Sequence, residues 1–252
     1  MNFNVKEETK KIIDFIRNYY KKQNLKGVVI GISGGKDSAV VAGLFTLALG
    51  KENVIGVTLP CHSNESDKND AKVISDKYGF ELINIDLTNS FDSFKLEIKK
   101  IGTYLQNQTK NSDINLKPRL RMSALYYIAA LYTELKNGIY LVAGTSNKSE
   151  LYVGYFTKGG DSSHDISVLS DFTVEEVIEI GKYIQVPKEV LYKTPSDGLS
   201  GQTDEEKLGV KYSQISAYLN NKNSVEKSIK EKIEKLHKSN KHKFIIPEYK
   251  RR

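Results

Sequence analysis

Cysteine, tryptophan and proline are scarce in this chain of 252 residues, which contains a single cysteine and no tryptophan. The lone Cys61 excludes an intrachain disulfide framework and a zinc site built from several cysteines. Apolar runs long enough to span a bilayer are also lacking, and the first residues, Met1 to Lys6, do not form the apolar stretch of a signal peptide. We therefore expect a cytoplasmic protein with no membrane partner.

The charge balance is basic, with a formal net charge of +7. The excess is mostly lysine, in short runs at residues 21–22 and 99–100 and in a tail from Lys222 to Arg252, with few aromatic residues between them. Such runs are typical of a solvated surface. We therefore expect no nucleic-acid partner.

The order of apolar segments predicts an α/β fold. Short β-branched runs at residues 28–32, 54–59, 80–85 and 139–143 alternate with helical patterns over residues 3–23, 66–78 and from Pro118 onward. Capping-box spacing predicts a further helix from Thr173, and two more are expected near residues 203–220 and 224–238. The expected architecture is a single domain with a doubly wound, mostly parallel five-stranded sheet, helices on both faces and a helical C-terminal part.

A glycine-rich segment lies between the first predicted strand and its helix, a position where α/β proteins bind ligands. Glycines let the backbone approach phosphate oxygens, and the following helix adds the positive end of its dipole. A carboxylate in such a loop is explained by Mg²⁺ held between protein and phosphates. The segment reads Gly31-Ile32-Ser33-Gly34-Gly35-Lys36-Asp37-Ser38.

The spacing of this segment matches neither the Walker nor the Rossmann pattern. The alternative without a ligand is a tight glycine turn. The segment resembles the SGGxDS loop of the ATP pyrophosphatase superfamily, which holds the β- and γ-phosphates of ATP as a leaving pyrophosphate. Members of that superfamily adenylate a substrate oxygen and then admit a nitrogen or sulfur nucleophile.

Three further segments resemble the ammonia-dependent NAD synthetases in order and spacing. They are Asn115-Leu116-Lys117-Pro118-Arg119-Leu120-Arg121-Met122, then Gly144-Thr145-Ser146-Asn147-Lys148-Ser149-Glu150 continuing through Gly154 to Asp161, and Pro195-Ser196-Asp197-Gly198-Leu199 continuing through Gly201 to Gly209. With the phosphate loop they cover nearly the whole chain. We expect one NAD synthetase domain over residues 1–252, with a phosphate loop at 31–38, a substrate loop at 144–165 and a basic tail from about 239 to 252.

The resemblance implies a role for each matching residue. Asp37 and Glu150 are the Mg²⁺ ligands and, with Lys158, the catalytic residues. ATP is bound by the eight residues from Gly31 to Ser38, by Thr145 and by Ser196. The contacts to deamido-NAD are Arg119, Lys158, Asp165, His242 and Lys243.

Four positions leave alternatives open. Arg121 is either a ligand contact or a surface arginine, because a helix turns it away from Arg119. His164 is expected to be a solvent-exposed loop residue, and the His242-Lys243 pair is either a substrate contact or part of a disordered tail. Val174 stands where the family usually has a lysine that meets ATP phosphates, and Lys36 is a candidate substitute.

The implied reaction is the amidation of deamido-NAD by ammonia, with ATP and Mg²⁺, to give NAD, AMP and pyrophosphate through an adenylated carboxylate. Glutamine use needs a second site with an activated cysteine, which we do not expect around Cys61. Relatives of this type are homodimers, so we expect a partner surface on the helices around residues 119–135 and 203–220. The alternatives are another ATP pyrophosphatase, such as a tRNA-modifying enzyme, and a regulatory nucleotide-binding protein without turnover.

Overall fold

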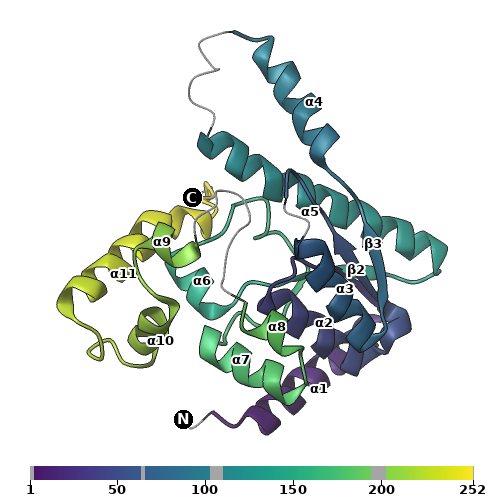
Figure 1. Ribbon diagram of the computed structural model, residues 1–252, viewed down its shortest axis with the longest axis horizontal. Helices are drawn as coiled ribbons and strands as arrows, with labels where there is room; N and C mark the ends of the chain where they lie inside the picture. Colours follow the sequence, from purple (N-terminus) through teal and green to yellow (C-terminus); the bar gives the residue numbers. More distant parts are fainter. Residues whose placement is uncertain (1–2, 64–65, 103–109, 194–202, 252) are drawn as a thin grey trace.

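Five parallel strands form the centre of the fold, in the spatial order β3-β2-β1-β4-β5 (Figure 1). They are β1 (Gly27–Gly31), β2 (Val54–Thr58), β3 (Glu81–Asn84), β4 (Tyr140–Gly144) and β5 (Ile166–Ser167). This computed structural model describes residues 3–63, 66–102, 110–193 and 203–251. Val28 of β1 pairs with Val54 of β2 and Leu141 of β4. The predicted doubly wound parallel sheet is confirmed.

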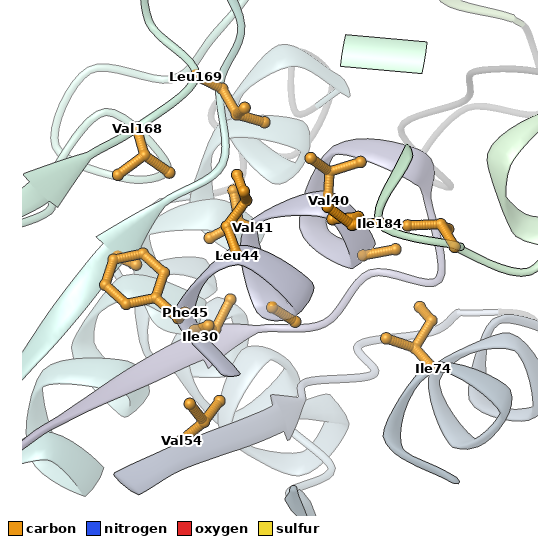
Figure 2. Packing of buried hydrophobic residues seen from close by; sticks show 14 of the residues in the cluster. Ile30, Val40, Val41, Leu44, Phe45, Val54, Ile74, Val168, Leu169 and Ile184 are labelled. Carbon is orange, nitrogen blue, oxygen red and sulfur yellow. The ribbon is translucent and has the colours of Figure 1, made fainter. Parts of the chain in front are cut away.

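One face of the sheet is covered by helices that pack around α2 (Lys36–Leu49). Its neighbours are α1 (Val5–Gln23), α3 (Ser66–Tyr78), α7 (Val174–Tyr183) and α8 (Lys188–Leu191). The sequence of α2 is apolar almost all round, as expected for a buried helix. Figure 2 shows Val41 and Phe45 of α2 lying close to Ile30 of β1 and to Val168 and Leu169.

The opposite face is covered by α5 (Lys110–Leu135), which contacts β1 and β4. Its residues Ile128 and Tyr132 belong to the same apolar cluster as Val29 and Val142 of the sheet. Helix α4 (Thr88–Lys99) packs against α5 and extends away from the sheet at the top of Figure 1. The prediction of helices on both faces is therefore confirmed.

The C-terminal part is helical, as expected, and has an apolar cluster of its own. It contains α6 (Lys148–Val153), α9 (Asp204–Leu208), α10 (Tyr212–Asn220) and α11 (Lys227–Asn240). Val153, Ile215 and Ile233 are fully buried there. The described residues also contain the 3-10 helices η1 (Lys51–Asn53) and η3 (Lys241–Lys243).

Three local predictions were wrong. The single helix expected near residues 203–220 is divided into α9 and α10, because Gly209 ends α9 in the left-handed conformation with φ +64°. The helix expected from Pro118 begins at Lys110 and carries the proline in its interior. Packing against α4 stabilises the added turns: Lys117 is buried with its Nζ 5.6 Å from the centroid of the Phe91 ring, and Asp113 pairs with Lys95 at 2.5 Å. These contacts offset the backbone hydrogen bond that proline removes.

The segment 144–165, expected to be an unbroken loop, contains α6. Asn147 caps this helix by accepting a hydrogen bond from the backbone N–H of Glu150, and the Glu150 carboxylate accepts one from the N–H of Asn147. This reciprocal capping box stabilises a helix of only six residues. In the described part of the chain, no helix is both long and apolar enough to cross a bilayer.

The packing of α2 predicts that truncating two of its residues lowers the free energy of unfolding by very different amounts. The Phe45 side chain is fully buried, whereas Leu47 is 46% exposed. Phe45→Ala should lower the free energy of unfolding by about 3–5 kcal/mol, because it leaves a cavity in the core. Leu47→Ala, the matched control on the same helix, should cost less than about 1 kcal/mol. Urea unfolding followed by circular dichroism measures both, and similar losses would contradict this packing.

Candidate active site at the ends of β1 and β4

The carboxyl ends of β1 and β4 lie side by side, where the connections from the two strands diverge. Parallel sheets bind ligands at such a switch point. A cavity of about 800 Å³ opens there, a volume in the range of small-molecule sites. Its lining includes most of the phosphate loop, Thr145 and Glu150 after β4, and one face of α5.

The phosphate loop, residues 31–38, is held in shape by its own hydroxyl groups. Gly34 has φ +78°, a left-handed conformation that glycine adopts without strain. The Ser38 hydroxyl donates to the Gly35 carbonyl at 3.0 Å and lies 3.2 Å from the Ser33 hydroxyl. Gly35, the N-cap of α2, has no side chain with which to cap the helix, and the first turn of this 14-residue helix lines the cavity. This is a suitable arrangement for binding an anion.

Two carboxylates are joined beside this loop through one asparagine. The Asn147 side chain donates from Nδ2 to Oδ1 of Asp37 at 3.0 Å, and its backbone N–H donates to Oε2 of Glu150 at 3.0 Å. Lys36 pairs with the other oxygen of Asp37, with Nζ 2.9 Å from Oδ2. Asn147 is fully buried and Lys36 nearly so, which fixes both carboxylates relative to the loop.

The charged groups of the site are close enough to shift the pKa values of Glu150 and Lys36. Burial, followed by the charge of Asp37, raises the pKa of Glu150 to about 8. Burial lowers the pKa of Lys36, but the carboxylate of Asp37 and its two acidic neighbours outweigh burial and raise it. The acidic groups of the site therefore outnumber the single positive charge of Lys36, and a bound cation would relieve this imbalance.

Asp37 and Glu150 have the chemistry to hold Mg²⁺. This ion prefers oxygen ligands and takes one or two carboxylates together with phosphate oxygens and water. Within the described ranges, no group of three or more His, Cys, Asp or Glu residues is arranged to hold a metal. A carboxylate pair beside an anion-binding loop therefore fits an ion shared with phosphates and does not fit a closed structural site.

Arg121 lines the cavity and is a ligand-site candidate that sequence reasoning left undecided. Its guanidinium donates to the Leu59 carbonyl at 3.0 Å and to the Ser63 hydroxyl at 3.4 Å, after the end of β2. Pro118, Arg121, Met122 and Leu125 all line the cavity from α5. Their spacing of three, four and seven residues is that of one helix face, and this pattern could have indicated Arg121 from the sequence.

Asp204 is a second residue of the site for which sequence reasoning gave no role. It is buried at the start of α9, lines the cavity and accepts a hydrogen bond from the Tyr155 hydroxyl at 3.0 Å. Its other oxygen lies 3.5 Å from the Tyr212 hydroxyl. The capping box of Thr203 and Glu206 predicts the helix start and hence the position of Asp204, but not the tyrosines that meet it.

Comparison with known proteins identifies the family of this chain. The family model described as NAD synthase matches residues 8–247. The chain belongs to the NAD synthase family. A relative from Methanococcus aeolicus named NH(3)-dependent NAD(+) synthetase is 43% identical over 86% of this chain and 82% of its own. One of the same name from Carboxydothermus hydrogenoformans is 37% identical over 98% of both. A solved structure of NMN synthetase from Francisella tularensis is 32% identical, with a TM-score of 0.87 over 99% of both chains.

The residues expected to contact deamido-NAD by resemblance to this family do not all lie together. Arg119 donates to the Lys158 carbonyl at 3.3 Å, and the Lys158 ammonium donates to the His242 carbonyl at 3.1 Å. These three residues are exposed and form a linked group beside the cavity. Asp165 lies apart from them, where it accepts hydrogen bonds from the Tyr126 hydroxyl and the Val142 N–H.

The first residues of the basic tail pack against the rest of the protein. The alternative that the tail is disordered was therefore wrong for residues 241–244. Lys243 lines the cavity and donates to the carbonyls of Gly154 and Phe156 at 2.7 and 2.8 Å. The Phe244 ring meets the Phe156 ring edge to face, with centroids 5.0 Å apart. The tail is thus attached to the segment that carries Lys158.

Three remaining expectations of the resemblance have different outcomes. Val174 is buried in the C-terminal apolar cluster and supplies no charge. His164, expected to be exposed, is half-buried and lines the cavity. Its ring packs against Gly144, where a Cβ atom would lie only 2.5 Å from the ring. Ser196 lies outside the described residues.

The raised pKa of Glu150 predicts a pH-dependent stability. A folded-state pKa of about 8, above the ordinary value of 4.5, stabilises the metal-free protein at low pH, and this contribution is lost as pH rises through about 8. In EDTA, the melting temperature of the wild type should fall more steeply between about pH 5 and pH 8 than that of Glu150→Gln. Mg²⁺ should reduce the decline because it binds the ionised carboxylate. Parallel profiles for the two proteins would contradict the assignment.

Proposed function

We propose that this chain is an ammonia-dependent NAD synthetase, which amidates the nicotinate carboxylate of deamido-NAD at the expense of ATP. The observation that carries the proposal is the carboxylate pair Asp37 and Glu150, joined through Asn147 beside an anion-binding loop at the switch point. Family membership supports the same reaction, and the two relatives compared are named for it.

In this reaction the phosphate loop holds the β- and γ-phosphates through its amides and the hydroxyls of Ser33 and Ser38. Thr145 and Ser196 contact ATP in our proposal. Asp37 and Glu150 hold Mg²⁺, which when bound neutralises the charge of the leaving pyrophosphate. The nicotinate carboxylate attacks the α-phosphorus, and pyrophosphate leaves. Ammonia then attacks the acyl carbon of the adenylate, loses a proton and expels AMP.

The dinucleotide lies beside the cavity in this proposal, where positive charge is gathered on Arg119, Lys158 and Lys243. These side chains are suited to the diphosphate and carboxylate of deamido-NAD, and Lys158 stabilises the charge that develops on the acyl group. His242 and Asp165 complete the proposed substrate contacts. No protein nucleophile is needed, because adenylation activates the carboxylate.

Nicotinate mononucleotide is a second candidate substrate. The solved structure with a TM-score of 0.87 is named an NMN synthetase, and the mononucleotide presents the same carboxylate to the same chemistry. We favour the dinucleotide because the two curated relatives, at 37% and 43% identity, are named NAD(+) synthetases.

We also propose a cytoplasmic homodimer. The apolar residues Phe94, Ile101, Tyr127 and Leu135 of the α4–α5 region are between 50 and 74% exposed. We propose that these residues contribute to a surface that another chain covers, and a second copy is the occupant that the resemblance implies. The cytoplasmic location is proposed from the resemblance to this family.

The assay that tests the function measures pyrophosphate released from ATP by the purified chain with Mg²⁺ and ammonium chloride. Release should require deamido-NAD, and NAD should form in equal amount. Nicotinate mononucleotide in its place distinguishes the second candidate, since faster turnover of the mononucleotide would reverse our preference. Ammonia-free glutamine should not support turnover. Pyrophosphate release without either nicotinate substrate would contradict the proposal.

Asp37→Asn should abolish turnover and leave the fold intact, because asparagine preserves the size of the side chain and removes the charge that holds the metal. A loss of about a hundredfold or more is expected when a group that stabilises the transition-state charge is removed. Steady-state kinetics at saturating Mg²⁺ measures the loss, and an unchanged circular dichroism spectrum is the control. A rate near that of the wild type would remove Asp37 from the mechanism.

A further inference from the structure

Both carboxylate oxygens of Asp37 have partners within the protein. Oδ1 accepts a hydrogen bond from Asn147 Nδ2 at 3.0 Å, and Oδ2 accepts one from the Lys36 ammonium at 2.9 Å. The Lys36 side chain is 7% exposed and that of Asp37 16%. An ion pair with so little access to water is screened weakly, so its two members depend on each other.

The ammonium of Lys36 occupies a place that is otherwise acidic. The carboxylates of Asp37, Glu150 and Asp204 all act on it electrostatically. Asp204 is bound by two tyrosine hydroxyls, which leaves Asp37 and Glu150 as the pair that a metal would use. The Tyr212 ring, 5.9 Å from Nζ, forms part of the same enclosure.

A metal and this ammonium cannot share Oδ2 of Asp37 without repulsion. Mg²⁺ binds oxygen at roughly 2.1 Å, and the ammonium lies 2.9 Å from the same atom. The two cations would then be at most about 5 Å apart in a poorly screened site, where like charges repel strongly. A metal at Oδ2 of Asp37 therefore competes with the ammonium for this oxygen.

We propose that Lys36 is a built-in counter-ion that competes with the divalent metal for Asp37. This inference rests on the proposed function, and it gives Lys36 the role of keeping metal binding weak until the nucleotide binds. Without nucleotide the lysine keeps the carboxylate paired and metal binding weak. The ATP phosphates supply new partners for the displaced ammonium, because Lys36 belongs to the phosphate loop. Metal and nucleotide therefore strengthen each other's binding through this one side chain.

The experiment measures Mn²⁺ affinity by calorimetry, with and without a non-hydrolysable ATP analogue, so it does not depend on turnover or on the nicotinate substrate. In Lys36→Gln without nucleotide, Mn²⁺ should bind about tenfold more tightly, as expected when one competing charge-assisted hydrogen bond is removed. The enhancement of Mn²⁺ affinity by the analogue should be smaller than in the wild type. Lys36→Arg keeps the charge and should keep the weak affinity of the wild type.

Lys193→Gln is the matched control, because Lys193 lines the same cavity and also pairs with an aspartate, Asp70, at 2.5 Å. It removes the same charge without touching Asp37 and should leave Mn²⁺ affinity unchanged. The proposal is overturned if Lys36→Gln binds Mn²⁺ no more tightly than the wild type, or if Lys193→Gln gives the same gain. If Lys36→Gln does not fold, Lys36→Met measured in the same way replaces it, with the same expectation.

Discussion

The parallel pairing of β1 with β4 is the constraint on which the rest of the structure depends. It brings residues 31–38 beside residues 144–150, although more than a hundred positions separate them in the chain. The hydrogen bond from Asn147 to Asp37 joins the two segments. Without that pairing, the phosphate loop and Glu150 would belong to separate regions and no shared carboxylate site would form.

Charge balance explains the composition of this site. Carboxylates gathered at the end of a buried sheet are costly unless each has partners. Asn147 supplies one donor to Asp37 and one to Glu150, tyrosines supply donors to Asp204, and Lys36 supplies a positive charge. The remaining imbalance, visible in the raised pKa of Glu150, would be relieved by the divalent cation that we propose to bind here.

Much of the sheet and its first helices could be predicted from the sequence, because buried β-branched runs and apolar helix faces determine them locally. The predicted helix at residues 66–78 has the bounds of α3. The start of α5 was mispredicted because contacts with α4, distant in sequence, stabilise its first turns. Helix α6 was missed although its capping box, between Asn147 and Glu150, is local and can be read from the sequence. The turn of residues 31–38 between β1 and α2 was evident from its glycines, whereas the positions of Arg121 and Asp204 in the cavity depend on partners that only the folded chain brings near.

The central claim is that ATP activates the nicotinate carboxylate at this site, so the most direct measurement follows the oxygen atoms of that carboxylate. Deamido-NAD labelled with oxygen-18 in its carboxylate is turned over with ATP and ammonium, and the products are analysed by mass spectrometry. Attack on the α-phosphorus predicts AMP that carries one labelled oxygen and pyrophosphate that carries none. Label in pyrophosphate or phosphate, or AMP without label, would contradict the account.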